Sequence, residues 1–398
     1  ILPSVEAVNY QSFDLFSFQH PNEQFQFDYL AYSPVTNNVL ISGTSLYSPT
    51  FIAATFSSWT AAGLTPSDTT SFKISPPGYH NCIPYNGGFL TNASYKDFYY
   101  VVWTCNSLTV KYDTFLFVVK MTSDATVSKQ VVFNVRSSTP NTLVGFLDTL
   151  IIVPTTLGLV ALDGDLEVKF QVTPSDGWVG YVVSPGNEPD SFVVGGIGDG
   201  ASRGSLVPSV ATFNSLGQLQ LEQVYEISGL PAIGGVNVNS EGIQLCLFSL
   251  GTAWSLMLDP KDLSVLSLQS ASAGGMGITC SGGQKSRAVT SVNYLAGFST
   301  WVFNLAGDLI TSFEGKGIND YSFSNYSTNT AYAGGGDFLL LPVTGTKGGT
   351  THQGFITVNM TVESNQLTRP SKSFSSLAKP TTGSNVTGWT WSKTAKLF

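Results

Sequence analysis

Charged side chains are scarce in this sequence: only 11% of its 398 residues are Asp, Glu, Lys or Arg, about half the usual share. Strong helix formers are correspondingly few, and Met occurs four times. Val, Phe, Tyr, Thr and Ile fit pleated, half-buried surfaces and take their place. The net charge is −8 and there is no basic cluster, which argues against nucleic-acid binding. A hydrophobic share of 42% is enough for a large core and excludes a disordered chain.

Long apolar runs are equally rare, and only the run from Leu143 to Leu162 approaches the length of a membrane span. Asp148 and Pro154 interrupt it, and Thr155 with Thr156 suits a turn. We therefore predict two buried strands here and no membrane span.

Cysteine is limited to Cys82, Cys105, Cys246 and Cys280, with no C-x-x-C pair of the kind used in zinc ribbons. Three connectivities exist. We favour Cys82–Cys105 and Cys246–Cys280, because each pair falls on neighbouring predicted strands. Disulfides indicate an oxidising compartment, whereas the alternative is four buried thiols in a cytosolic protein.

Four N-x-S/T sequons occur, at Asn92, Asn325, Asn359 and Asn385. Together with the cysteines they predict a secreted, N-glycosylated protein. The chain starts at Ile1 without a basic and apolar leader, as expected of a mature chain from which a signal peptide has been removed.

A hairpin pattern recurs along the chain: an apolar strand, a polar turn, and a second strand opened by an aliphatic residue. Clear copies are LGLVALDGDL (157–166) and AWSLMLDPKDL (253–263). Seven copies align on the aliphatic residue after the turn, at Leu64, Val127, Leu166, Leu219, Leu263, Leu309 and Leu367. Between copies lies another pair of strands, as in 234–250, so each period supplies four antiparallel strands.

This pattern resembles the seven-bladed β-propellers over nearly the whole chain. The resemblance implies an all-β fold, a single β-propeller of seven blades of four antiparallel strands, with six or eight blades as alternatives. It carries no functional residues, because the sequence lacks the Trp-Asp, S-x-D-x-G-x-T-W and kelch signatures of named propeller families.

Residues 1–374 are expected to form the propeller, with an N-terminal strand in 13–19 completing the last blade. Residues 375–398 are expected to form a tail rich in Ser, Thr, Gly and Pro. Residues 1–72 carry five acids and no Lys or Arg, whereas residues 364–398 carry five basic residues and no acid. Aromatic side chains at a tail are costly to leave in water, so we expect Trp389, Trp391 and Phe398 to dock. They can dock on their own chain, or on the acidic N-terminal region of another copy to build rings or filaments.

Candidate catalytic groups are dispersed. The histidines His20, His80 and His352 are interpreted as unrelated loop residues and not as a metal site. One set of acids lies in the repeated turns, where we favour a structural role over catalysis, at Asp163, Asp165, Asp259, Asp262 and Asp308. Another set lies in other loops that can reach one face of the ring, at Asp176, Glu188, Asp190, Asp199, Asp320 and Asp337. The glycine-rich stretch 195–205 lacks the GK[ST] ending of a phosphate-binding loop. We expect no catalytic residue, no metal and no cofactor.

The sequence therefore favours a non-enzymatic extracellular subunit that binds partners or assembles with copies of itself in a coat, wall or filament. The alternative is a lectin, or a carbohydrate-active enzyme, using loop carboxylates and aromatic residues on one face. A third reading is a receptor ectodomain with 375–398 as its linker.

Overall fold

The computed structural model describes residues 11–15, 25–36, 38–45, 48–56, 58–60, 63–65, 68–73, 77–109, 113–124, 126–136, 143–155, 158–174, 178–199, 206–227, 232–239, 241–249, 251–272, 277–282, 286–293, 297–305, 309–315, 317–318, 321–326, 331–333, 338–359, 375–376, 381–383 and 389–392. Within these ranges the only helix is the short 3₁₀ turn η1 (Ala93–Tyr95), and none is long and apolar enough to cross a membrane.

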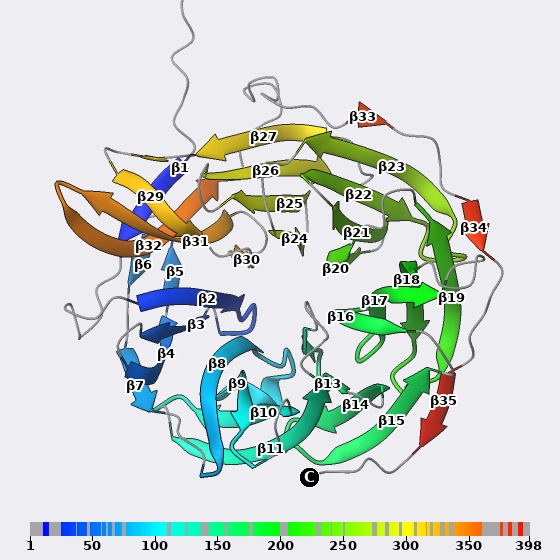
Figure 1. The fold of residues 1–398 in the computed structure, drawn as a ribbon, viewed down its shortest axis with the longest axis horizontal. Helices are drawn as coiled ribbons and strands as arrows, with labels where there is room; N and C mark the ends of the chain where they lie inside the picture. Colours follow the sequence, from blue (N-terminus) through cyan, green and yellow to red (C-terminus); the bar gives the residue numbers. More distant parts are fainter. Residues whose placement is uncertain are drawn as a thin grey trace, which may run out of the picture.

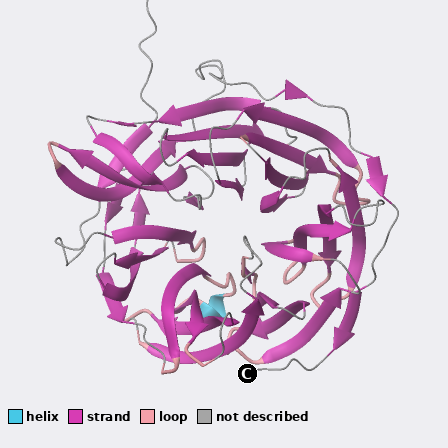
Figure 2. Cartoon of the chain, in the orientation of Figure 1, coloured by secondary structure: helices cyan, strands magenta, loops and turns pink. Residues whose placement is uncertain are grey.

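The strands of the described residues form seven antiparallel sheets of four or more strands, arranged in a ring (Figures 1 and 2). We number these sheets blades 1 to 7 in chain order. In blades 1 to 6 successive strands lie progressively further from the centre of the ring. The chain is therefore a β-propeller, as its sequence predicts.

The strands of blades 1 to 4 have the following bounds. Blade 1 contains β2 (Phe25–Tyr32), β3 (Val39–Ser45), β4 (Ser48–Phe56) and β7 (Asp68–Lys73). Blade 2 contains β8 (Tyr79–Gly88), β9 (Phe98–Ser107), β10 (Asp113–Thr122) and β11 (Val127–Arg136). Blade 3 contains β12 (Gly145–Phe146), β13 (Leu150–Thr155), β14 (Gly158–Asp163) and β15 (Val168–Pro174). Blade 4 contains β16 (Val179–Pro185), β17 (Phe192–Asp199), β18 (Leu206–Phe213) and β19 (Leu219–Glu226).

The remaining blades follow the same pattern until the last. Blade 5 contains β20 (Ala232–Asn239), β21 (Gly242–Ser249), β22 (Thr252–Leu258) and β23 (Val265–Ser272). Blade 6 contains β24 (Gly277–Gly282), β25 (Ser286–Asn293), β26 (Gly297–Asn304) and β27 (Leu309–Gly315). Blade 7 contains β28 (Gly317–Ile318), β29 (Tyr321–Tyr326), β30 (Ala331–Ala333), β31 (Phe338–Lys347), β32 (Thr350–Asn359) and β1 (Gln11–Leu15).

Strand β1 occupies the edge of blade 7 and pairs antiparallel with β32, from Gln11 opposite Val358 to Leu15 opposite Gly354. The last blade is thus assembled from an N-terminal strand and from strands of residues 317–359. Blade 1 contacts blade 7 through β2 and β31, which closes the ring.

The hydrophobic core consists of layers between neighbouring blades. One layer joins Ile152 of blade 3 to Val194 of blade 4, and the next joins Tyr225 of blade 4 to Leu245 of blade 5. Since a blade buries both of its faces, the middle strands of blade 3 are apolar along most of their length. The apolar run of residues 143–162 accordingly contains the buried strands β13 and β14, paired from Leu150 opposite Asp163.

The turn between the third and fourth strands begins with a short side chain that accepts backbone hydrogen bonds. Asp163 Oδ1 accepts from the N–H groups of Asp165 (3.0 Å) and Glu167 (2.9 Å). Asn214, Asp259 and Thr122 accept from backbone N–H groups in the turns of blades 4, 5 and 2. The turn acids therefore have the structural role that the sequence predicts.

Two details of the repeat differ from the prediction. Leu166 and Leu263 lie inside their turns with left-handed backbones (φ 58° and 59°), and not at the start of a strand. Leu64 lies in a separate hairpin of β5 (Ser58–Thr60) and β6 (Gly63–Thr65), while β7 is the outer strand of blade 1. Leu367 lies outside the described residues.

Candidate interaction surface

Three short strands from the C-terminal segment lie on the outside of the ring (Figure 1). They are β33 (Ser375–Ser376), β34 (Thr381–Gly383) and β35 (Trp389–Ser392), which we call the strap. They pair antiparallel with β23, β19 and β15, the outermost strands of blades 5, 4 and 3. The strap therefore follows the ring in the direction opposite to the chain order of the blades.

The strap binds through its backbone. An outermost strand presents a row of unpaired N–H and C=O groups, and an extended segment can satisfy them by pairing as a further strand. In β35, Trp389 lies opposite Pro174 and Ser392 lies opposite Gln171. The backbone of Trp389 and Trp391 is thus paired with a blade of the same chain, whereas the docking expected for their side chains lies outside the described side chains. Phe398 lies outside the described residues.

Other blades keep an open edge in the part of the chain that the structure describes. Strands β7, β11 and β27 end their sheets there and pair on one side only. On β11 the half-exposed Lys129 forms an ion pair with Glu167 of blade 3. A lysine is a common means of discouraging unwanted pairing at a sheet edge.

A belt of polar contacts joins the turns between the first and second strands of neighbouring blades. Asp190 of blade 4 accepts hydrogen bonds from the N–H groups of Thr149 (2.7 Å) and Leu150 (3.0 Å) of blade 3, and from the Thr149 hydroxyl. Asn187 donates through Nδ2 to the Asn239 carbonyl of blade 5 (3.1 Å). These contacts fix the spacing of the blades, and they employ one of the loop acids that the sequence offers for chemistry.

The belt continues to blade 2 through a predicted glycosylation site. Asp148 of blade 3 accepts hydrogen bonds from the Thr91 hydroxyl (2.9 Å) and from Asn92 Nδ2 (3.1 Å). Asn92 also caps η1, its Oδ1 accepting from the Ser94 N–H at 3.1 Å. Asn325 and Asn359 lie in β29 and β32, and Asn385 lies outside the described residues.

Buried tyrosines form a second set of hydrogen bonds between neighbouring blades. The Tyr100 hydroxyl of blade 2 donates to the Gly164 carbonyl of blade 3, and Tyr225 of blade 4 donates to the Leu263 carbonyl of blade 5, both at 2.8 Å. Burial raises the pKa of both phenols, so they remain protonated donors at physiological pH.

The remaining acids are spread over the ring. Asp165 pairs with Lys120 of blade 2 at 2.7 Å, and Asp262 accepts from the Ser264 N–H at 2.8 Å. Glu188 is exposed beside Asp190. The other acids weighed for chemistry lie outside the described side chains: Asp176, Asp199, Asp308, Asp320 and Asp337. Among the described residues, no three His, Cys, Asp or Glu side chains gather closely enough to hold a metal ion.

The two described histidines lie in strands of blades 2 and 7, and not in the loops that the sequence predicts for them. His80 is exposed in β8 and His352 is in β32, while His20 lies outside the described residues. Trp103, Trp178 and Trp301 are buried in the layers between blades. These tryptophans fill the space between sheets.

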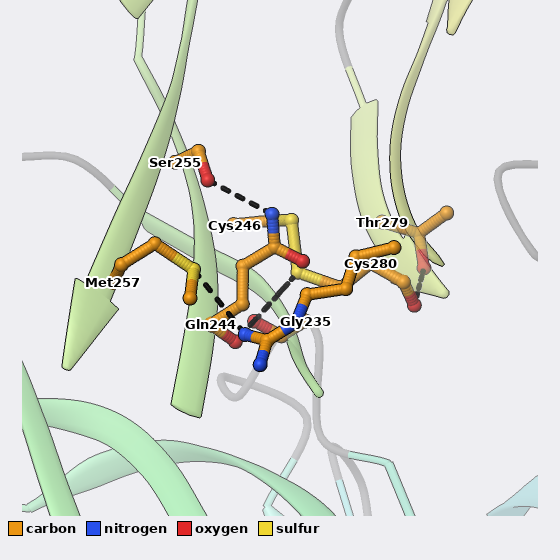
Figure 3. The surroundings of a disulfide bond; sticks show 8 residues. Gly235, Gln244, Cys246, Ser255, Met257, Thr279 and Cys280 are labelled. Carbon is orange, nitrogen blue, oxygen red and sulfur yellow. Dashed lines mark hydrogen bonds between the residues drawn. A yellow bond between two sulfur atoms is a disulfide. The ribbon is translucent and has the colours of Figure 1, made fainter. Parts of the chain in front are cut away.

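Both predicted disulfides are present. Cys82–Cys105 joins β8 to β9 within blade 2. Cys246–Cys280 joins β21 to β24, and Figure 3 shows it with its surroundings. The second bond therefore links two blades, and not neighbouring strands of one sheet.

No protein-family model matches the sequence, and no curated protein matches it. Among solved structures the chain is similar to the Dos1 propeller (TM-score 0.48, 10% identity, covering 90% of this chain and 97% of that one). It is also similar to prolyl oligopeptidase B from Galerina marginata (TM-score 0.49, 9% identity, covering 92% and 52%). A third is a mutant of the Aleuria aurantia lectin in complex with alpha-methyl-L-fucoside (TM-score 0.42, 12% identity, covering 88% and 99%). At such identities the likeness is one of fold alone.

The ring of sheets and its strap place the chain in the class of β-propellers. In the described residues, some outer blade edges are paired with the strap and some are open, and these edges are its candidate interaction surface.

Proposed function

We propose that this chain is a secreted, N-glycosylated, non-enzymatic subunit whose outer blade edges receive extended strands, including the strap of another copy. The observation that carries the proposal is the strap itself. Three different blades accept a distant segment of the chain as an additional strand.

The dimensions of the strap favour exchange between copies. Its strands contain two, three and four residues, so each alone makes few hydrogen bonds. The three strap strands are linked in one chain, so the binding of one raises the effective concentration of the others at their blade edges. A second copy of the protein offers the same edges to the same strap. Exchange of such an element between identical chains is a low-cost route to assembly.

The disulfides and sequons support the extracellular assignment. Two disulfides with no free cysteine in the described residues are typical of an oxidising compartment. The sequon at Asn92 lies in a surface turn, and its side chain is half-buried. A glycan on Nδ2 would replace one of the two amide hydrogens, and the other can still donate to Asp148.

The test compares the full chain with a chain lacking residues 375–398, by light scattering across a concentration series and by negative-stain microscopy. We expect oligomers of the full chain that are lost on truncation. Thr390→Pro, which removes a strap N–H, should weaken association, whereas Thr390→Ser should not.

Two results would count against the proposal. One is a full chain that stays monomeric at every concentration, with a truncated chain that does not bind an added 375–398 peptide. The other is saturable binding to a glycan array by both chains, which would favour the lectin alternative.

A further inference from the structure

The contact between blades 5 and 6 contains a buried positive charge that the proposed function does not use. Its apolar part surrounds the Cys246–Cys280 bond and includes Ile278, Val289 and Trp301. At one end this layer becomes polar, where Gln244 and Met257 lie beside the disulfide (Figure 3). Arg287 of β25 is completely buried at this end.

The hydrogen bonds of Arg287 go to neutral acceptors. Its Nη2 donates to the Gly242 carbonyl (3.0 Å) and to Asn239 Oδ1, and its Nη1 lies 3.2 Å from Met257 Sδ, a weak acceptor. No carboxylate of the described residues forms an ion pair with it. Glu241 is near enough to favour the charge, but its side chain is exposed.

Three donor groups near this guanidinium are buried without a partner. They are the Arg287 Nε–H and the amide NH₂ groups of Asn237 and Asn239. Gln244 Oε1 is also without a partner, while its Nε2 donates to Ser255 Oγ at 2.9 Å. The Ser255 hydroxyl can donate as well as accept, so a 180° rotation of the Gln244 amide would keep the hydrogen bond between the two side chains. The Gln244 NH₂ group would then be a further donor without a partner.

Strand register brings these groups to one face. Asn237 lies directly opposite Gln244, and Asn239 is two residues further along β20, so all three share the side that faces blade 6. On blade 6, Arg287 lies opposite Gly282. A Cβ on Gly282 would come within 1.8 Å of Asn237 Oδ1, so the Asn237 amide covers this glycine beside Arg287.

A guanidinium charge buried between two blades without a counterion is unfavourable. Burial lowers the pKa of Arg287 to about 10, which still leaves the guanidinium protonated at neutral pH. Water could satisfy the unpartnered donors but would not balance the charge, whereas a small anion does both. The enclosure of the donor atoms excludes a large ligand.

We propose that the Arg287 site between blades 5 and 6 binds a small monovalent anion of the halide class, held by Arg287, Asn237 and Asn239. The anion acts as the counterion of Arg287 and stabilises the contact between the two blades. A ligand that binds only the folded state raises stability in proportion to the logarithm of its concentration.

The test measures the melting temperature of the full chain at constant ionic strength while sodium gluconate is replaced by sodium chloride or bromide. Above the dissociation constant of the site, we expect the melting temperature to rise in proportion to the logarithm of the halide concentration. Crystals soaked in bromide should give an anomalous peak beside Arg287 Nε. A melting temperature independent of the anion, with no bromide peak, would overturn the proposal and leave water as the occupant.

Three variants make the test specific. Arg287→Met should abolish the halide dependence, and Lys261→Met, which removes an exposed cation of blade 5, should retain it. Because Arg287→Met can fail to fold, Asn239→Asp provides a second arm. This substitution places a carboxylate beside Arg287 without changing the shape of the side chain. It should raise stability in gluconate, and it should increase the halide concentration that half-fills the site at least about tenfold. A halide response that is unchanged in Asn239→Asp would contradict the site.

Discussion

Asp190 illustrates how single residues hold the ring together. Its backbone is left-handed (φ 57°), a conformation that Asp tolerates better than most residues, and this aims its carboxylate at the turn of blade 3. Three donors of that turn depend on it.

Asp190→Ala should therefore destabilise the protein by about 2–4 kcal/mol, because two backbone N–H groups and the Thr149 hydroxyl lose their acceptor. Urea unfolding measures the change. Glu188→Ala, in the same turn but exposed, should change the free energy of unfolding by less than about 0.5 kcal/mol. Equal effects of the two substitutions would show that the belt does not stabilise the blades.

The pair of Lys120 and Asp165 gives a pH-dependent contact. Lys120 is buried, with Nζ 3.9 Å from the centre of the Phe98 ring, and its hydrogen bond and charge lower the pKa of Asp165. The stabilisation is therefore complete above the unfolded pKa, near 3.9, and is lost as pH falls through the lower folded pKa.

We expect Asp165→Asn to lower the melting temperature by a roughly constant amount from about pH 5 to 8, and the difference from wild type to vanish in strong acid. Asp165 is mostly exposed, so solvent screening keeps the effect small. Asp97→Asn, at another exposed acid, should leave the profile unchanged. A difference that grows towards low pH would refute the role of the ion pair.

Residue roles could be predicted where they are local. The acids at 163, 259 and 262 accept from N–H groups two residues away, and the sequence correctly favours turn roles for them. Asp190 could not be assigned in this way, because Thr149 is 41 residues distant and belongs to another blade. Arg287 and Asn239 are separated by 48 residues, and no spacing rule connects them.

At the scale of elements, the two disulfides differ in what they join. Cys82–Cys105 links strands that already pair in blade 2, whereas Cys246–Cys280 ties blade 5 to blade 6. The sequence separations of 23 and 34 residues are similar, so loop entropy alone predicts about 3–4 kcal/mol for each bond.

We expect Cys246→Ala with Cys280→Ala to be the more damaging pair. It should make the amides of β20 and β24 exchange hydrogen faster, because it removes both the bond and apolar volume from the layer between two blades. Cys82→Ala with Cys105→Ala should affect exchange mainly within β8 and β9. Hydrogen exchange read by mass spectrometry separates the two, and an identical global effect would argue against blade-specific roles.

The repeat predicts the blades better than their boundaries. Alternation and apolar runs identify β13, β14, β21 and β22, since inner strands must be buried on both faces. The inserted hairpin β5–β6 displaces the outer strand of blade 1 to β7, which the aliphatic anchor at Leu64 does not reveal. Pairing of the strap depends on backbone groups, which every residue carries, and so leaves little trace in sequence.

For the whole molecule, we expect β1 to contribute to closure of the ring. This strand pairs along all five of its residues with β32, and it joins the N-terminal part of the chain to the last blade. Its loss would open the outer edge of β32 in the last blade.

Deletion of residues 1–15 should therefore lower stability by several kcal/mol, on the basis of about 1 kcal/mol for each backbone hydrogen bond lost. It should also promote association, because an open edge pairs with other strands. Deletion of residues 1–10, which keeps β1, is the matched control and should have little effect on either property. Thermal unfolding together with light scattering reports both. If the two deletions behave alike, closure must rest on the contact of blade 1 with blade 7 and not on β1, and the ring would then be held by the same apolar layers that join its other blades.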